Sequence, residues 1–244
     1  MAAPSARAVV VDVEGTTTDI RFVHDTLFPV ARRDLPAYVA AHPGSPEVEA
    51  ARGAVARERG LPAEAVGEGE LTAALLAWID ADRKETTLKA LQGKIWRSAY
   101  ESGGLRSHVY PDVEPALRRW RDLGVTLAVF SSGSVEAQQL LFRHTPSGDL
   151  TGLFAAYFDT TTGPKREPAA YQRIAAALGL PPGEVLFLSD VVAELDAAAA
   201  AGMRTVQLLR PGTAPEAGSR HAAAERFDQI ALQPAGLAGA GSAD

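Results

Sequence analysis

Five short apolar runs, each bounded by polar or turn-forming residues, place the strongest constraint on how this chain can fold. Runs of this length without polar alternation are typical of strands buried on both faces. Segments with helical periodicity, several of them ending in glycine, separate the last four runs. This alternation predicts an α/β fold with a parallel, doubly wound sheet and right-handed crossovers. The runs are 8–12, 125–132, 153–160, 185–190 and 204–209.

The interval between the first two runs has a different pattern. Residues 22–108 contain no good buried-strand run and are expected to form amphipathic helices over 24–42, 45–60, 68–82 and 84–103. We therefore expect a helical cap domain inserted into an α/β core made of 1–21 and 109–232. The segment 233–244 is rich in Ala and Gly without periodicity, which predicts a disordered tail.

Charge and cysteine content exclude several kinds of protein. The net charge of -6 argues against a nucleic-acid or anionic-membrane partner. The absence of cysteine excludes disulfides, thiolate metal sites and cysteine nucleophiles. The N-terminal residues lack the pattern of a secretory signal, and the run 8–11 is too short to cross a bilayer. We expect a soluble, cytoplasmic protein.

Polar residues that could take part in catalysis or ligand binding follow the apolar runs. In open α/β sheets, ligands bind beyond the carboxyl ends of the strands, so residues that follow different strands can converge there. Taken singly, each of these residues is more often a turn residue, a helix cap or a solvated side chain. Their occurrence together after successive strands favours a catalytic site. They are Asp12 and Glu14, Ser131 and Ser132, Lys165, and Asp190.

This set of residues suits phosphoryl transfer. The carboxylate of Asp12 can attack phosphorus and form an aspartyl-phosphate. Asp12 and Asp190 are plausible ligands of one Mg²⁺, which would neutralise charge on the phosphate. Glu14 projects to the same side as Asp12 in an extended segment and can act as acid and base. The hydroxyls of Ser131 and Ser132 and the ammonium group of Lys165 can bind phosphoryl oxygens.

Four motifs resemble those of the haloacid dehalogenase superfamily of aspartyl phosphotransferases. They are "DVEGT" at 12–16, "SSG" at 131–133, Lys165 in "TTGPKREP", and "LSDVVAELDAA" at 188–198. Phosphatases of that superfamily usually carry Asp two residues after the nucleophile, where this chain has Glu14. The longer side chain keeps acid–base chemistry possible and points to a narrower group.

Further motifs resemble the enolase-phosphatases of methionine salvage, also called acireductone synthases. They are "DVEGTTTDIRFVHDTLFP", "DRKETTLKALQGKIWRSAYESG", "HVYPDV" and "FSSGSVEAQQLLF". The resemblance implies a monomer that enolises and then dephosphorylates a small phosphorylated diketone, 2,3-diketo-5-methylthiopentyl-1-phosphate. It also implies Mg²⁺ bound by Asp12, the backbone carbonyl of Glu14, and Asp190, with substrate contacts from Ser131, Ser132 and Lys165. The proton acceptor in enolisation stays open between Glu14 and Lys165.

Two other functions fit the same motifs. One is a different Mg²⁺-dependent phosphatase, or a dehalogenase, of the same superfamily. The other is a catalytically silent sensor of a phosphorylated ligand, which the retention of every reactive residue disfavours. The cap segment contains Lys84, Lys89 and Lys94, and we expect at least one of them to lie on a solvated helix face. We expect Lys84 or Lys89 to face the cleft and help close the cap over substrate.

Overall fold

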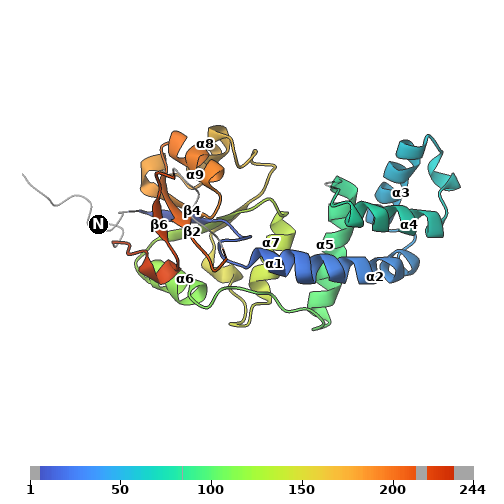
Figure 1. Ribbon diagram of the computed structural model, residues 1–244, viewed down its shortest axis with the longest axis horizontal. Coiled ribbons are helices and arrows are strands. Elements are labelled where there is room, and N and C mark those ends of the chain that lie inside the picture. Colours follow the sequence, from blue (N-terminus) through green and yellow to red (C-terminus); the bar gives the residue numbers. More distant parts are fainter. Residues whose placement is uncertain (1–5, 84, 213–218, 234–244) are drawn as a thin grey trace, which may run out of the picture. The chain divides into compact units, whose positions relative to one another are not determined.

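The computed structural model describes residues 6–83, 85–212 and 219–233. The chain divides into two compact units (Figure 1). Unit 1 is Met1–Ile20 with Ser107–Asp244, and unit 2 is Arg21–Arg106. Lys84 and residues 234–244 of the expected tail lie outside the described residues.

Unit 1 is built on a parallel sheet of six strands in the order β3-β2-β1-β4-β5-β6. The order reverses direction between β1 and β4, which is the point where ligands bind in sheets of this class. The α/β, doubly wound class predicted from the sequence is confirmed. The strands are β1 (Ala8–Val11), β2 (Thr126–Phe130), β3 (Ala156–Phe158), β4 (Val185–Ser189), β5 (Arg204–Leu208) and β6 (Ala222–Ala224).

Helices cover the sheet because its central strands are apolar on both faces. In Figure 1, α8 and α9 lie over one face and α6 lies on the other side. Val10 and Phe187 pack into one buried cluster with Tyr171 of α8 and Leu195 of α9. Each fully buried side chain of this size contributes about 1.5–3 kcal/mol. The helices are α6 (Val113–Asp122), α7 (Val135–Arg143), α8 (Pro168–Ala177) and α9 (Val192–Ala200).

Two details of the sheet differ from the expected elements. The run 153–160 is a strand only over β3, and its first residue, Leu153, belongs to the 3-10 turn Thr151–Leu153. Strand β6 was not predicted. Its three alanines carry no β-branched or aromatic side chain, so it has no strand signal of its own. It forms by pairing with β5 at the edge of the sheet.

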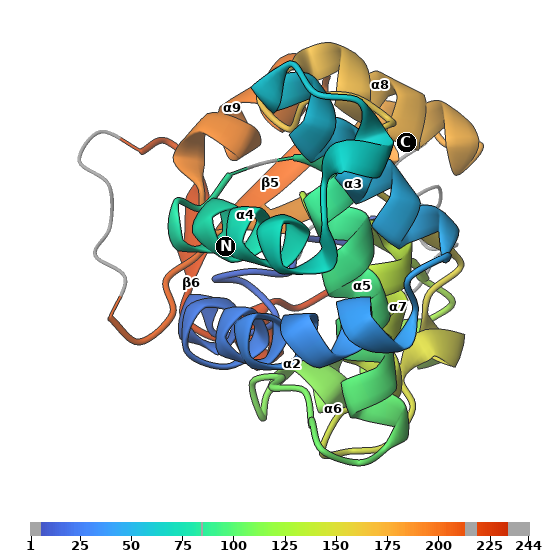
Figure 2. The same ribbon diagram turned by 90° about the vertical axis from the view of Figure 1, so that its right-hand side faces the viewer.

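Unit 2 is helical (Figure 2). The expected helix over 24–42 begins earlier and is interrupted by a π-helical turn at Val23–Leu27. Leu35, Leu71, Leu75 and Leu91 are buried in a separate core cluster. The helices are α1 (Ile20–Phe22), α2 (Phe28–Ala41), α3 (Pro46–Arg59), α4 (Glu68–Asp80) and α5 (Thr86–Glu101).

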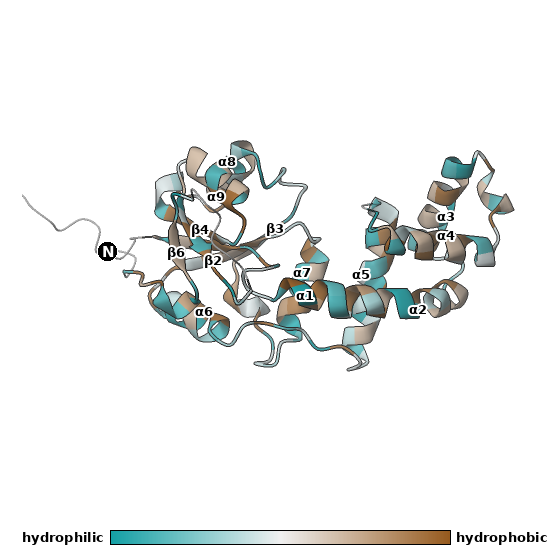
Figure 3. Cartoon of the chain, in the orientation of Figure 1, coloured by the Kyte–Doolittle hydropathy of each residue, from teal (hydrophilic) through white to brown (hydrophobic). Residues whose placement is uncertain are grey.

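Hydropathy along the helices matches this packing. Figure 3 shows hydrophobic and hydrophilic residues alternating around the helices, as expected for elements with one buried face. Among the described residues, we find no helix with the length and apolar character needed to cross a membrane.

Candidate active site

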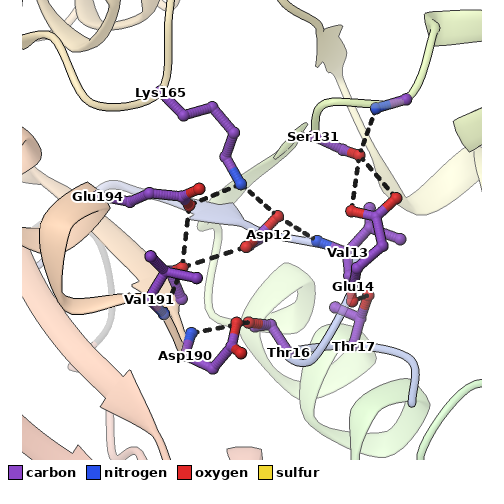
Figure 4. A network of polar contacts seen from close by, with 12 residues as sticks. Asp12, Val13, Glu14, Thr16, Thr17, Ser131, Lys165, Asp190, Val191 and Glu194 are labelled. Carbon is purple, nitrogen blue, oxygen red and sulfur yellow. Dashed lines mark hydrogen bonds and ion pairs between the residues drawn. The ribbon is translucent and has the colours of Figure 1, made fainter. Parts of the chain in front are cut away.

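The carboxyl end of β1 places Asp12 at the centre of a buried polar network (Figure 4). Val11 pairs with Leu188 of β4, so the next residue, Asp12, lies beside Ser189. The Ser189 hydroxyl donates to Asp12 Oδ2 at 3.1 Å. The backbone N–H of Val13 donates to Asp12 Oδ1 at 2.7 Å. Asp12 is only 2% exposed, so these contacts hold its carboxylate in a defined orientation.

Lys165 comes from the loop after β3 and contacts this carboxylate. Its Nζ donates to Asp12 Oδ1 at 2.6 Å and pairs with Glu194 Oε2 at 2.6 Å. Burial alone would lower the pKa of Lys165, but Asp12 and Glu194 outweigh it and raise the pKa to about 12. Lys165 therefore stays a protonated ammonium group across the physiological range.

Glu194 is a member of the network to which the sequence interpretation gave no role. It lies in the first turn of α9, is 8% exposed, and also accepts from the Ser189 hydroxyl at 3.1 Å. Burial, followed by the nearby Asp12 carboxylate, raises the pKa of Glu194 to about 7. Its position four residues after Asp190 on a helix that follows the strand was the signal that could have identified it.

Glu14 lies on the opposite side of Asp12 from Glu194, next to Ser131 (Figure 4). The Ser131 hydroxyl lies 3.0 Å from Glu14 Oε2 and 3.2 Å from Oε1, so it donates to this carboxylate. The same hydroxyl accepts the N–H of Gly133 at 3.0 Å. Burial and the charge of Asp12 raise the pKa of Glu14. A raised pKa suits a carboxyl group that must give and take a proton near neutral pH.

Ser132 is exposed beside the buried Ser131, at the end of β2. The following residue pair leads into α7, whose first turn is capped by Ser134 accepting from the Ala137 N–H at 3.3 Å. The hydroxyl of Ser132 and the amides around this helix start can contact an anion. Gln138 of α7 donates to the backbone carbonyl of Gly133 at 2.8 Å and so supports the turn.

Asp190 follows β4 and contacts the loop after Asp12. Thr16 Oγ1 donates to Asp190 Oδ1 at 3.1 Å and accepts the Asp190 N–H at 3.0 Å. Gly15, with φ of 76°, passes so close that a Cβ there would lie 2.3 Å from Asp190 Oδ2. Burial and the charge of Asp12 raise the pKa of Asp190. The loop is therefore packed directly against this carboxylate.

The residues singled out in the sequence thus converge from four strand ends of unit 1. The polar contacts form three neighbouring groups: Lys165 binds Asp12, Ser131 donates to Glu14, and Thr16 is hydrogen-bonded to Asp190 (Figure 4). The arrangement places three carboxyl groups, a hydroxyl group and a buried ammonium group at the carboxyl ends of these strands.

Known proteins share both the sequence and this fold. The model of the haloacid dehalogenase-like hydrolases matches residues 6–202. The protein "Enolase-phosphatase E1" of Sorangium cellulosum is 86% identical over 231 residues, which cover 95% of this chain and 100% of the relative. A protein of the same name from Pseudomonas aeruginosa strain UCBPP-PA14 is 55% identical and covers 84% of this chain and 91% of its own length.

The chain belongs to the enolase-phosphatase family of haloacid dehalogenase-like hydrolases. Among solved structures, the UTR4 protein of Saccharomyces cerevisiae superposes with a TM-score of 0.78 at 34% identity, covering 92% of this chain and 99% of its own. A 2-haloacid dehalogenase of Pseudomonas syringae pv. Tomato DC3000 shares the fold, with a TM-score of 0.58 at 19% identity and coverage of 92% and 96%.

Two further features of this family member escaped the sequence interpretation besides Glu194. Thr16 closes the motif "DVEGT" but was given no role of its own, and its hydroxyl is hydrogen-bonded to Asp190. Arg210 and Asp112, from distant segments, form a buried ion pair at 2.8 Å. Asp112 lies in the motif "HVYPDV", which the sequence analysis identified. Its ion-pair partner Arg210 lies in none of the motifs.

Proposed function

We propose that this protein is a bifunctional enolase-phosphatase of methionine salvage. It converts 2,3-diketo-5-methylthiopentyl-1-phosphate to 1,2-dihydroxy-3-keto-5-methylthiopentene and phosphate, by enolisation and then dephosphorylation. The observation that carries the proposal is the Asp12–Lys165 contact of 2.6 Å with Glu14 on the other side of Asp12. The names of the two bacterial relatives support the same conclusion.

Asp12 is the proposed nucleophile of the dephosphorylation. Its Oδ atom attacks phosphorus, the bond from phosphorus to the enol oxygen breaks, and an aspartyl-phosphate forms on Asp12. Glu14 protonates the leaving oxygen and then removes a proton from the water that hydrolyses the aspartyl-phosphate. The Val13 N–H donates to Asp12 Oδ1, and the Ser131 hydroxyl donates to Glu14 Oε2.

Lys165, Ser131 and Ser132 are the proposed phosphate-binding groups. Lys165 brings a positive charge next to the carboxylate that attacks a dianion, which reduces repulsion between the two. The Ser131 hydroxyl donates to Glu14 and can donate instead to a phosphoryl oxygen. The pKa of Lys165, about 12, makes it a poor proton acceptor, so we assign enolisation to Glu14 of the two candidates.

Mg²⁺ is the proposed cofactor, and the residues present fit it. Asp12, Asp190 and the backbone carbonyl of Glu14 are hard oxygen donors, the type that Mg²⁺ prefers together with water and substrate oxygens. The pKa of Asp190 is raised partly by the charge of Asp12, so the two carboxylates repel one another without a cation. The proposed set has two carboxylates and a backbone carbonyl, and among the described residues no group of three or more His, Cys, Asp or Glu side chains suited to a metal is found. When bound, Mg²⁺ would neutralise phosphate charge and acidify the C–H beside a carbonyl.

The decisive experiment supplies the diketone phosphate with Mg²⁺ and follows enol absorbance and phosphate release together. Wild type should show both. Asp12→Asn should lose phosphate release by at least a hundredfold while enol formation stays measurable, because the nucleophile is not the enolisation base. Full hydrolysis by Asp12→Asn would exclude the covalent mechanism. No turnover by wild type, with or without EDTA, would instead favour a silent phospho-ligand sensor.

We also propose that the protein works as a monomer in the cytoplasm, without nucleic-acid or membrane partners. The absence of cysteine and the net charge of -6 support this setting. Gel filtration with light scattering would measure the mass directly, and 25.6 kDa is expected for one chain.

A further inference from the structure

Arg210 is a buried arginine that the proposed chemistry does not use. It follows β5 by two residues and is 3% exposed. Its Nε donates to the backbone carbonyl of Thr16 at 2.8 Å. Its Nη1 lies 2.9 and 2.8 Å from the two carboxylate oxygens of Asp112 and donates to the Glu225 carbonyl at 3.1 Å. One guanidinium group thus joins three segments that are far apart in the sequence.

The surroundings of Arg210 hold this guanidinium in one orientation. Its central carbon lies 4.3 Å from the ring centre of Tyr110 and 5.1 Å from that of Phe227. Asp112, its ion-pair partner, also accepts the Phe227 N–H at 2.7 Å. Replacing a buried ion pair by apolar groups is often neutral or stabilising, so stability alone does not explain why a charged group is placed here.

Thr16 connects Arg210 to the active site. Thr16 is fully buried, and its carbonyl is held by Arg210 while its hydroxyl is engaged with both the carboxylate and the N–H of Asp190. The next carbonyl, of Thr17, accepts the Tyr110 N–H at 3.0 Å. The outer side of the loop is therefore anchored at two successive carbonyls, and its inner side touches Asp190.

We propose that Arg210 is a positioning residue for the metal site and acts through Thr16 on Asp190. Its Nε–H holds the Thr16 carbonyl, and this keeps the Thr16 hydroxyl on the Asp190 carboxylate. This inference rests on the proposed function, in which Asp190 is a ligand of Mg²⁺. Groups that orient metal ligands in this way typically change metal affinity or activity 10–100-fold when they are removed.

The test combines two substitutions in a double-mutant cycle. Arg210→Lys keeps the charge next to Asp112, but its single ammonium group cannot reproduce the fork that also reaches Thr16. Thr16→Val keeps the backbone carbonyl and removes the hydroxyl that contacts Asp190. Thr16→Ser, which keeps the hydroxyl, is the matched control. The primary readout is the Kd for Mn²⁺ of substrate-free protein, measured from the EPR signal of free Mn²⁺.

Arg210→Lys and Thr16→Val should each weaken Mn²⁺ binding by about 10–100-fold, and Thr16→Ser should stay close to wild type. The double variant Arg210→Lys/Thr16→Val should bind Mn²⁺ no more weakly than Thr16→Val alone, because Arg210 acts through the missing hydroxyl. In Arg210→Lys, kcat should fall more than KM rises. A purely structural role would lower Tm equally in both backgrounds and leave Mn²⁺ binding unchanged.

Two outcomes separate the inference from the proposed function. If Arg210→Lys binds Mn²⁺ as wild type does, or if its effect is the same in the Thr16→Val background, the inference is wrong. If wild type and Asp190→Asn bind Mn²⁺ alike, the proposed metal site itself is wrong. Should Arg210→Lys fail to fold, the variant Arg210→Met/Asp112→Asn removes both buried charges together and should show the same loss of Mn²⁺ affinity.

Discussion

At the scale of single residues, Gly15 shows how closely the backbone and the site chemistry are connected. It follows Glu14 and has a left-handed φ of 76°, which a side chain disfavours. Any Cβ there would meet the Asp190 carboxylate at 2.3 Å, a distance that requires movement of one or the other. The glycine therefore permits both the turn of the loop and the contact between Thr16 and Asp190.

Gly15→Ala should lower both stability and turnover, and Gly60→Ala is its matched control. Gly60 has a similar φ of 67° but nothing within 4 Å of an added Cβ. Left-handed strain alone costs about 1–2 kcal/mol, which both variants should show in urea unfolding. Gly15→Ala should in addition lose about a hundredfold in kcat, because displacement of a reacting group by about 1 Å has that effect. Equal kcat values for the two variants would contradict the assigned contact.

At the scale of elements, the ends of the strands could be predicted from the sequence. The side-chain contacts that join one loop to another could not. Apolar runs locate β1 and β4, and the residues that follow them, Asp12 and Asp190, must then meet at one edge of the sheet. Arg210 gives no such signal, since its partners Asp112 and Thr16 are 98 and 194 positions away. Only the folded backbone brings such side chains together, so no local pattern identifies them.

Helix α5 carries Lys89, a cap residue whose role stays a prediction. Lys89 is exposed on α5, whereas Lys94 of the same helix pairs with Glu47 at 3.4 Å. We expect Lys84 or Lys89 to face the cleft and help close the cap over substrate, whereas the ion pair of Lys94 with Glu47 gives that lysine a role within unit 2. This expectation follows from the clustering of lysines in a chain that otherwise uses arginine.

The double variant Lys84→Ala/Lys89→Ala should lower kcat/KM for the diketone phosphate by about tenfold or more, since a hydrogen bond to a charged group contributes about 1.5–3 kcal/mol. Lys94→Ala is the control on the same helix and should leave kcat/KM near the wild-type value. Steady-state kinetics at saturating Mg²⁺ measure all three. An unchanged kcat/KM in the double variant would rule out a substrate contact from either lysine.

At the scale of the whole molecule, the two units have separate hydrophobic cores, and the proposed metal ligands lie in only one of them. Phe187 and Leu195 belong to the core cluster of unit 1, and Leu71 and Leu91 to that of unit 2. All proposed Mg²⁺ ligands come from unit 1, at the ends of β1 and β4. A ligand that binds only the native state of one unit stabilises that unit by mass action. Metal binding should therefore distinguish the two units.

Hydrogen exchange with and without Mg²⁺ tests this division. At a Mg²⁺ concentration a hundred times its Kd, the native state gains about 2.7 kcal/mol, so the slowest amides of β1 and β4 should exchange about a hundredfold more slowly. Amides of α3 and α4 in unit 2 should change little, because no proposed Mg²⁺ ligand lies in that unit. In Asp190→Asn, the Mg²⁺ effect on β1 and β4 should disappear. Equal slowing in both units of the wild type would mean that they open together, and slowing that persists in Asp190→Asn would place the metal elsewhere.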